Sequence, residues 1–269
     1  MPGPGRLDLD DRQLEYRWVP AAHANPNHPV LVFLHEGLGC TASWRHFPIQ
    51  VVQQTGHSAF VYSRAGYGTS SSVSLPRPLH YMHDEGLDVL PRLLDKLQFE
   101  SVILIGHSDG ASIALIHAGG YRGNAASRVS GIVALAPHVF NEDVSVASIR
   151  EAACAYRDGD LRDKLKRLHG DNVDCAFWGW NEAWLHPRFL AWNIEEYLPG
   201  VSVPVLIIQG LDDQYGTAAQ YRAIEAQCGG KVDVLVVDDC GHSPHREQTV
   251  ITLTAITNFV RRLVDQRRT

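Results

Sequence analysis

The feature that most constrains the fold of this chain is a strand-like run, a glycine-flanked serine and a helix-like run in direct succession. Residues 102–105 (VILI) are followed by residues 106–110 (GHSDG) and then by residues 111–116 (ASIALI). The first run predicts a buried strand and the last predicts a helix, so Ser108 would stand in a sharp turn between them. Glycine at both flanks fits this turn, because only glycine-sized neighbours let a strand and a helix approach so closely.

The geometry of this turn suits a nucleophilic side chain. The hydroxyl of Ser108 would project above the edge of the sheet, and the N–H of Asp109 would lie at the helix N-terminus, where negative charge is stabilised. Because G-x-S-x-G also occurs by chance, the alternative is that Ser108 is only the N-cap of a buried helix. The strand before the serine and the helix after it favour the nucleophile.

The rest of the chain alternates in the same way. Short runs rich in Val, Ile and Leu alternate with longer segments of helical period, which predicts an α/β fold with a mostly parallel central sheet and helices on both faces. Strands are predicted at residues 30–34, 59–62, 102–105, 132–135, 205–208 and 232–237, with an antiparallel edge hairpin of residues 7–10 and 14–19. Helices are predicted near residues 43–54, 79–97, 110–119, 216–228 and 246–266.

One long segment breaks this alternation. Residues 137–203 carry no strand signal and are rich in charge, histidine and tryptophan. Since a structureless loop of such length is uncommon, we expect a mainly helical cap inserted into a core domain of residues 1–136 and 204–269. Its tryptophans either form the cap's own small core or wall a substrate pocket, for which Trp178 and Trp184 are the candidates. The tryptophans of this segment are Trp178, Trp180, Trp184 and Trp192.

Composition argues against several classes of partner. The chain is 45% hydrophobic and 20% charged with a net charge of −6, and it has no basic patch interleaved with aromatics, so nucleic acid is not an expected partner. It contains no run of eighteen apolar residues and no apolar core near its first residue, so neither a membrane span nor a signal peptide is expected. Five cysteines without short spacing favour a reducing cytoplasm, and no histidine pair has the spacing of a metal site.

A serine nucleophile needs a base that removes its proton and an acid that orients the base. In an open α/β sheet both groups are expected in loops that follow later strands. Residues 209–216 (QGLDDQYG) and residues 238–245 (DDCGHSPH) follow the last two predicted strands. The acid is therefore either Asp of the first loop, and the base is either His of the second.

The order serine, acid, histidine resembles the α/β-hydrolase superfamily over nearly the whole chain. The resemblance implies that Asp213, three positions after a strand-ending glycine, is the acid and that His242, directly after a glycine, is the base. Asp212 and His245 would then be a turn residue and a polar residue at a helix start. Residues 62–70 (YSRAGYGTS) also resemble the family's D-x-P-G-x-G-x-S loop. The resemblance implies a serine hydrolase with a helical cap, without metal or cofactor.

Residues 35–39 (HEGLG) resemble the family's oxyanion loop, with Glu36 on the usual glycine. The resemblance implies that the N–H groups of Gly37 and Asp109 hold the oxyanion. Two carboxylates would then stand beside a site that must stabilise negative charge. We expect Glu36 to pair with Arg64 and Asp109 to cap its helix, both turned away. The alternative is that one carboxyl is protonated or contacts a cationic or hydroxylated substrate.

Together these residues predict an acyl-transfer hydrolase that acts on a small-molecule carboxylic ester, lactone or thioester through Ser108. Carbon–carbon bond hydrolysis and haloperoxidase-type perhydrolysis on the same triad are the alternatives among enzymes. The former is disfavoured because its enzymes usually carry a tryptophan soon after the catalytic histidine, where this chain has residues 243–246 (SPHR). A non-catalytic binding module on the same fold is the alternative of another class. The sequence makes no prediction of oligomeric state.

Overall fold

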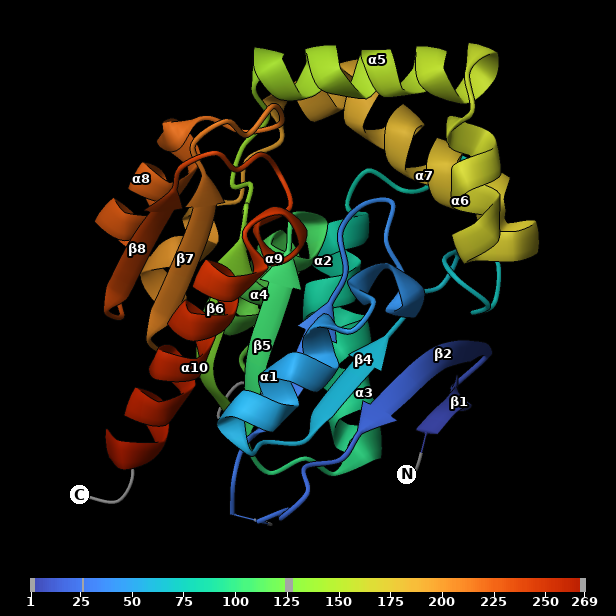
Figure 1. Ribbon diagram of the computed structural model, residues 1–269. Helices are drawn as coiled ribbons and strands as arrows, with labels where there is room; N and C mark the ends of the chain where they lie inside the picture. The colour runs from blue at the N-terminus through green and yellow to red at the C-terminus, as the bar shows by residue number, and fades with distance from the viewer. Residues whose placement is uncertain (1–2, 26, 124–127, 267–269) are drawn as a thin grey trace.

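The computed structural model describes residues 3–25, 27–123 and 128–266 (Figure 1). Its centre is an eight-stranded sheet in the order β1-β2-β4-β3-β5-β6-β7-β8. The β1–β2 hairpin is antiparallel, β2 pairs antiparallel with β4, and all other pairs are parallel. The strands are β1 (Gly3–Leu9), β2 (Arg12–Val19), β3 (Val30–Leu34), β4 (Ala59–Tyr62), β5 (Val102–His107), β6 (Val129–Leu135), β7 (Val205–Gly210) and β8 (Val232–Val237).

Helices connect the parallel strands. The α-helices are α1 (Phe47–Thr55), α2 (Tyr81–Asp84), α3 (Leu90–Leu97), α4 (Asp109–Gly120), α5 (Asp143–Asp158), α6 (Leu161–His169), α7 (Val173–Leu185), α8 (Ala218–Gln227), α9 (Pro244–Glu247) and α10 (Thr249–Gln266). A π-helical segment, η2 (Glu85–Val89), joins the helices α2 and α3. The 3-10 turns are η1 (Thr41–Trp44), η4 (Gly170–Asn172), η5 (Pro187–Ala191) and η6 (Glu195–Gly200).

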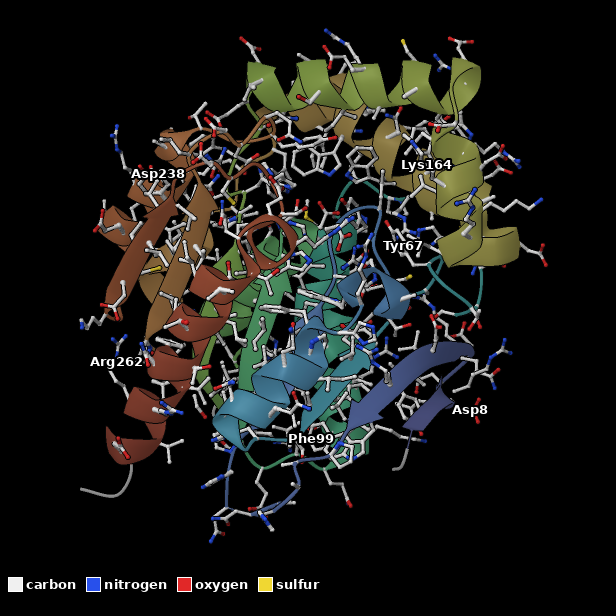
Figure 2. The ribbon with its side chains drawn as sticks, viewed as in Figure 1. Asp8, Tyr67, Phe99, Lys164, Asp238 and Arg262 are labelled. Carbon is white, nitrogen blue, oxygen red and sulfur yellow. The ribbon has the colours of Figure 1, made fainter. Side chains whose placement is uncertain are left out.

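The sheet separates two apolar layers, because successive side chains of a strand point to opposite faces. In β3, Leu31 and Phe33 belong to the layer formed with α1 and α10, whereas Val32 and Leu34 belong to the layer formed with α3, α4 and α8. Charged side chains such as those of Lys164, Asp238 and Arg262 lie on the outside (Figure 2). The predicted α/β fold, with its parallel strands covered on both faces and its edge hairpin, is confirmed.

Helices α5, α6 and α7 lie across the carboxyl ends of the central strands (Figure 1). Residues 137–203 are mainly helical, as predicted. Their only β pairing is an isolated bridge between Phe140 and Asn193. These helices pack through aromatic rings, of which Tyr156 on α5 and Phe177 on α7 are stacked with centroids 3.7 Å apart. The division into a core and a cap domain at the stated boundaries stays a prediction.

Two predicted helices are divided in the structure. The helix expected at 43–54 consists of η1 and then α1, because Arg45 between them has a φ of 51° that no helix accommodates. The helix expected at 246–266 consists of α9 and α10, with Gln248 between them at φ −128° and ψ 55°. No helix in the described part of the chain is long and apolar enough to cross a membrane.

Candidate active site

Ser108 stands in the sharp turn that its sequence context predicts. It has φ 52° and ψ −119°, a backbone conformation that costs a non-glycine residue about 1–3 kcal/mol. A Cβ at Gly106 would lie 2.4 Å from the Gly110 oxygen, and a Cβ at Gly110 would lie 2.0 Å from the Leu34 oxygen. Since either atom would overlap the backbone, only glycine fits at both positions. The predicted strand, turn and helix are thus confirmed.

Ser108 and His242 line the same cavity, which encloses about 120 Å³ between the carboxyl ends of the strands and the helices above them. Side chains far apart in the sequence therefore meet at one edge of the sheet, as they do in open α/β folds. The cavity is also lined by four residues that the sequence singled out: Glu36, Gly37, Asp109 and Trp184.

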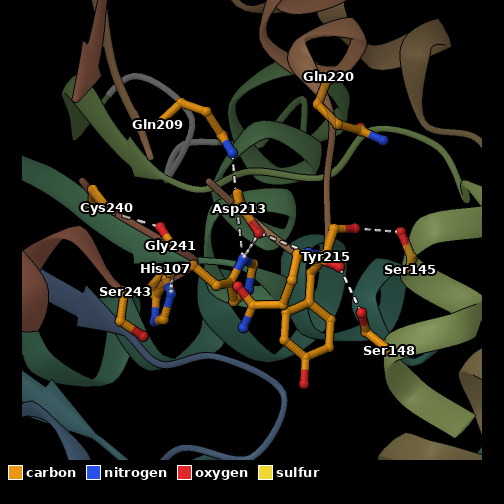
Figure 3. Close-up of polar contacts among 12 residues, drawn as sticks. His107, Ser145, Ser148, Gln209, Asp213, Tyr215, Gln220, Cys240, Gly241 and Ser243 are labelled. Carbon is orange, nitrogen blue, oxygen red and sulfur yellow. Dashed lines mark hydrogen bonds and ion pairs between the residues drawn. The ribbon is translucent and has the colours of Figure 1, made fainter. Parts of the chain in front are cut away.

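The carboxylate of Asp213 holds the ring of His242. Figure 3 shows Gln209 reaching the same carboxylate. Nδ1 of His242 is 2.9 Å from each carboxylate oxygen of Asp213, whose side chain is 1% exposed. The Nε2 of Gln209 and the N–H of Tyr215 donate to the same carboxylate at 2.7 and 2.8 Å. Burial alone would raise the pKa of Asp213, but the hydrogen bond and charge of His242 lower it. Asp213 is therefore ionised at neutral pH and orients the imidazole with Nδ1–H towards itself.

The loop that carries His242 is braced from two sides. The carboxylate of Glu247 on α9 accepts hydrogen bonds from the N–H groups of Gly241 at 2.7 Å and Ser243 at 2.9 Å. Nε2 of His107 lies 2.7 Å from the backbone oxygen of His242 and donates to it. The histidine of the GHSDG turn thus fixes the backbone of the histidine that shares the cavity with Ser108.

The loop that carries Asp213 is tied to α5. The hydroxyl of Ser145 donates to the backbone oxygen of Tyr215 at 2.5 Å, and that of Ser148 donates to the backbone oxygen of Gln214 at 2.6 Å. Figure 3 shows both serines reaching this loop from the helix. The position of Asp213 therefore depends on a helix of the predicted cap.

Among the cavity residues that sequence reasoning missed are two whose rings lie beside His242. His138 follows β6, and its ring centroid lies 5.5 Å from that of His242. Burial, together with the charge of His242, lowers the pKa of His138 to about 3, so its ring is neutral. The Tyr215 ring, 4.7 Å from that of His242, also lines the cavity. Each stands at or just beyond the carboxyl end of a central strand, a signal that could have marked both.

The expected pairing of Glu36 with Arg64 is wrong. The guanidinium donates instead to backbone oxygens, those of His35 and Glu36. The carboxylate of Glu36 lines the cavity with Oε2 3.4 Å from Nδ1 of His107. Burial alone would raise the pKa of Glu36, but the interaction with His107 and the charges of His35 and His245 lower it. Glu36 is therefore ionised beside the cavity, not turned away from it.

The expected helix cap at Asp109 is also wrong. Its buried carboxylate accepts a hydrogen bond of 2.5 Å from the hydroxyl of Tyr81, which accepts one of 3.0 Å from the indole N–H of Trp184. Burial raises the pKa of Asp109, although the charge of Arg64 and the Tyr81 hydrogen bond oppose this. This chain of hydrogen bonds joins the residue after Ser108 to α7 across the cavity wall.

The cavity wall on α7 differs from the predicted one. Trp184 lines the cavity as expected, but Trp178 does not. The Trp178 ring packs with the guanidinium of Arg157, 5.1 Å from its centroid, and with the ring of Tyr156 on α5. Trp180 lines the cavity instead. Helical geometry places residues 180 and 184 on one face of α7 and residue 178 on another.

His245 is more than a polar residue at a helix start. It lies on α9 as expected but is 3% exposed, with its ring 4.8 Å from Trp44 and 4.9 Å from His107. Burial lowers its pKa well below the usual range, with the charge of His107 acting in the same direction. Asp212 is exposed in the turn after β7, as expected, and its N–H donates to the backbone oxygen of Cys240.

Comparison with known proteins bears on the whole architecture. Residues 31–251 match the model of the alpha/beta hydrolase family. A search of curated protein sequences finds no match.

Solved structures share the fold at low sequence identity. A proline iminopeptidase of Mycobacterium smegmatis is 18% identical over 97% of this chain and 98% of that one, with a TM-score of 0.75. A thermophilic esterase from Thermogutta terrifontis is 17% identical over 97% and 98%, with a TM-score of 0.72. One of the epoxide hydrolases found in metagenomes from hot environments is 19% identical over 97% and 99%, with a TM-score of 0.71. With the family model covering most of its length, this chain belongs to the alpha/beta hydrolase family.

Proposed function

We propose that this protein is a serine hydrolase that cleaves a small carboxylic ester, lactone or thioester by acyl transfer. Ser108 is the nucleophile, His242 is the general base and acid, and Asp213 orients and stabilises the imidazole. One observation carries the proposal: the ring of His242, held at Nδ1 by a buried ionised Asp213, lines the same cavity as a serine on a strained strand-to-helix turn.

The reaction proceeds in two halves. His242 takes the proton of Ser108 Oγ as this oxygen attacks the substrate carbonyl carbon. The tetrahedral oxyanion accepts hydrogen bonds from the N–H groups of Gly37 and Asp109, which both belong to residues that line the cavity. His242 then protonates the leaving group, and an acyl-enzyme remains. His242 then removes a proton from water as it attacks the acyl carbon. As the bond to Ser108 Oγ breaks, the imidazolium returns this proton to Oγ, which releases the acid and regenerates the free serine.

The walls of the cavity favour a small substrate with apolar parts. Leu38, Ile149, Trp180 and Trp184 line it, and its volume is about 120 Å³. A serine hydroxyl assisted by a neutral imidazole forms acyl-enzymes from esters and related carbonyl compounds. The similar solved structures include an esterase by name, which supports this class.

Labelling by a fluorophosphonate probe and hydrolysis of a p-nitrophenyl ester panel test the proposal. We expect native protein to be labelled and active, and Ser108→Ala to lose labelling together with at least about a thousandfold in kcat/KM. The matched control is Ser112→Ala, one helical turn further on α4, which should keep its label. Labelling that persists in Ser108→Ala would overturn the assignment. Native protein that is neither labelled nor active would instead indicate a binding module.

A further inference from the structure

The carboxylate of Glu36 lines the cavity, and among the described residues its only ion-pair partner is His107. Its side chain is 20% exposed, and its one ion-pair contact is the 3.4 Å separation of Oε2 from Nδ1 of His107. This separation is long for a charge-assisted hydrogen bond, which is about 2.7–2.9 Å. Apart from this long contact with His107, no side chain in the described part of the chain donates a hydrogen bond to either oxygen. The carboxylate therefore keeps acceptor capacity for a group that enters the cavity.

The surrounding loop is built to hold the carboxylate there. A Cβ at Gly39 would lie 2.2 Å from Oε2 of Glu36, so the absence of a side chain at Gly39 leaves room for the carboxylate. The N–H of Gly39 donates to the backbone oxygen of Glu36 at 3.1 Å and closes this turn. Arg64 is engaged by backbone oxygens and does not neutralise the carboxylate. Glu36 stays ionised because the interaction with His107 and the charges of His35 and His245 lower its pKa despite burial.

The remaining lining has the chemistry of a cation site. The rings of Trp180, Trp184 and Tyr215 line the cavity, and the described lining contains neither lysine nor arginine. Aromatic faces beside a carboxylate attract ammonium groups, and desolvation strengthens this attraction. With the ionised carboxylate of Glu36 at the wall, a substrate carboxylate or phosphate would be repelled.

We propose that Glu36 is a specificity-determining residue that binds an ammonium group of the substrate, so that the compound hydrolysed is a cationic ester. This inference rests on the proposed function of Ser108, because it names the substrate class of the same cavity. Glu36 and the tryptophans bind the charge, while Ser108 and His242 carry out the acyl transfer.

Matched esters that differ only in charge test the inference at one pH. Acetylcholine and 3,3-dimethylbutyl acetate place the difference in the alcohol part, and the methyl esters of alanine and isobutyric acid place it in the acyl part. We expect native enzyme to favour the cation at least about tenfold in kcat/KM in one pair. Glu36→Gln should lower this ratio about ten- to a hundredfold. Glu182→Gln, an equal change of charge at an exposed position of α7, should preserve the ratio.

The outcomes separate this inference from the proposed function. Equal rates within both pairs, or a preference that survives in Glu36→Gln, would overturn the role of Glu36 while hydrolysis and Ser108 labelling stand. Failure of all four esters together with absent labelling would overturn both. If Glu36→Gln does not fold, the hydrolysis of a neutral ester by native enzyme is measured in the presence of tetramethylammonium chloride and, separately, of sodium chloride. Competitive inhibition by tetramethylammonium chloride beyond that by sodium chloride supports the inference, and equal effects of the two salts contradict it.

Discussion

At the scale of single residues, the site depends on a few atoms held by short contacts. Asp213 receives hydrogen bonds from Gln209, Tyr215 and His242, so its lone pairs are occupied and its charge is maintained in a buried position. The neighbouring Asp212 is exposed and makes no such contacts with its side chain among the described residues. Two adjacent carboxylates of the same chemistry are thus given different roles by their surroundings.

The pair Asp213→Asn and Asp212→Asn tests this difference. An amide at position 213 removes the negative charge that stabilises the imidazolium and allows the wrong tautomer, so we expect kcat to fall by about three to four orders of magnitude. Asp212→Asn has the same change of chemistry one residue earlier and should stay within about twofold of native enzyme. Steady-state kinetics with a p-nitrophenyl ester measure both. Similar losses in the two variants would show that the acid has been wrongly chosen.

At the scale of secondary structure elements, the acid loop and the helices above the sheet form one mechanical unit. Ser145 and Ser148 stand three residues apart on α5, so both hydroxyls face the same loop and hold two successive carbonyls next to Asp213. The hydrogen bonds from Trp184 to Tyr81 and from Tyr81 to Asp109 join α7 to the start of α4. The helices of the predicted cap therefore position the site as well as cover it.

Removal of both serine hydroxyls tests the coupling between α5 and the acid loop. Because each hydrogen bond contributes about 1 kcal/mol, Ser145→Ala with Ser148→Ala should loosen the loop and lower kcat about tenfold, with a modest loss of thermal stability. Thr254→Ala removes a comparable hydroxyl, which donates to a helix carbonyl on α10, and should leave kcat unchanged. Kinetics and thermal unfolding measure both effects. A double variant with native kcat would contradict the coupling.

At the scale of the whole molecule, a set of buried histidines links stability to pH. Burial lowers the pKa of each of them, and their rings are neutral in the folded protein at pH 7. The unfolded chain binds protons at these positions as pH falls below about 6.5, so it holds more protons than the folded state and is favoured by acid. The histidines in this set are His35, His57, His117, His138, His169 and His245.

We expect the free energy of unfolding to decrease as pH is lowered from 7 to 5. Each strongly shifted histidine contributes a loss of about 2 kcal/mol over this interval, and that of His138 continues towards its folded pKa of about 3. Asp109 and Glu85 act in the opposite direction, because burial raises the pKa of both carboxyls. Urea unfolding followed by tryptophan fluorescence measures the net effect. A midpoint that does not change between pH 7 and 5 would contradict it, and His117→Asn should weaken the dependence.

The sequence by itself determined the features of the fold that depend on residues close together in the chain. The strand, the glycines and the helix around Ser108 are contiguous, and their close approach is a property of the short backbone segment. Short apolar runs alternating with helical segments likewise predicted the parallel sheet, because strands that are buried on both faces must be apolar along their whole length. His242 and Asp213 were identified through the resemblance, and the structure places them in contact.

The tertiary structure alone decided which side chains face one another. The helical face of α7 that meets the cavity depends on how this helix packs, so Trp180 replaces Trp178. Arg64 binds backbone oxygens that only the folded loop brings together, and Glu36 is consequently left to the cavity. The neutral ring of His138 follows from burial by segments distant in sequence. Orientation and desolvation arise from long-range packing, which no local pattern of residues encodes.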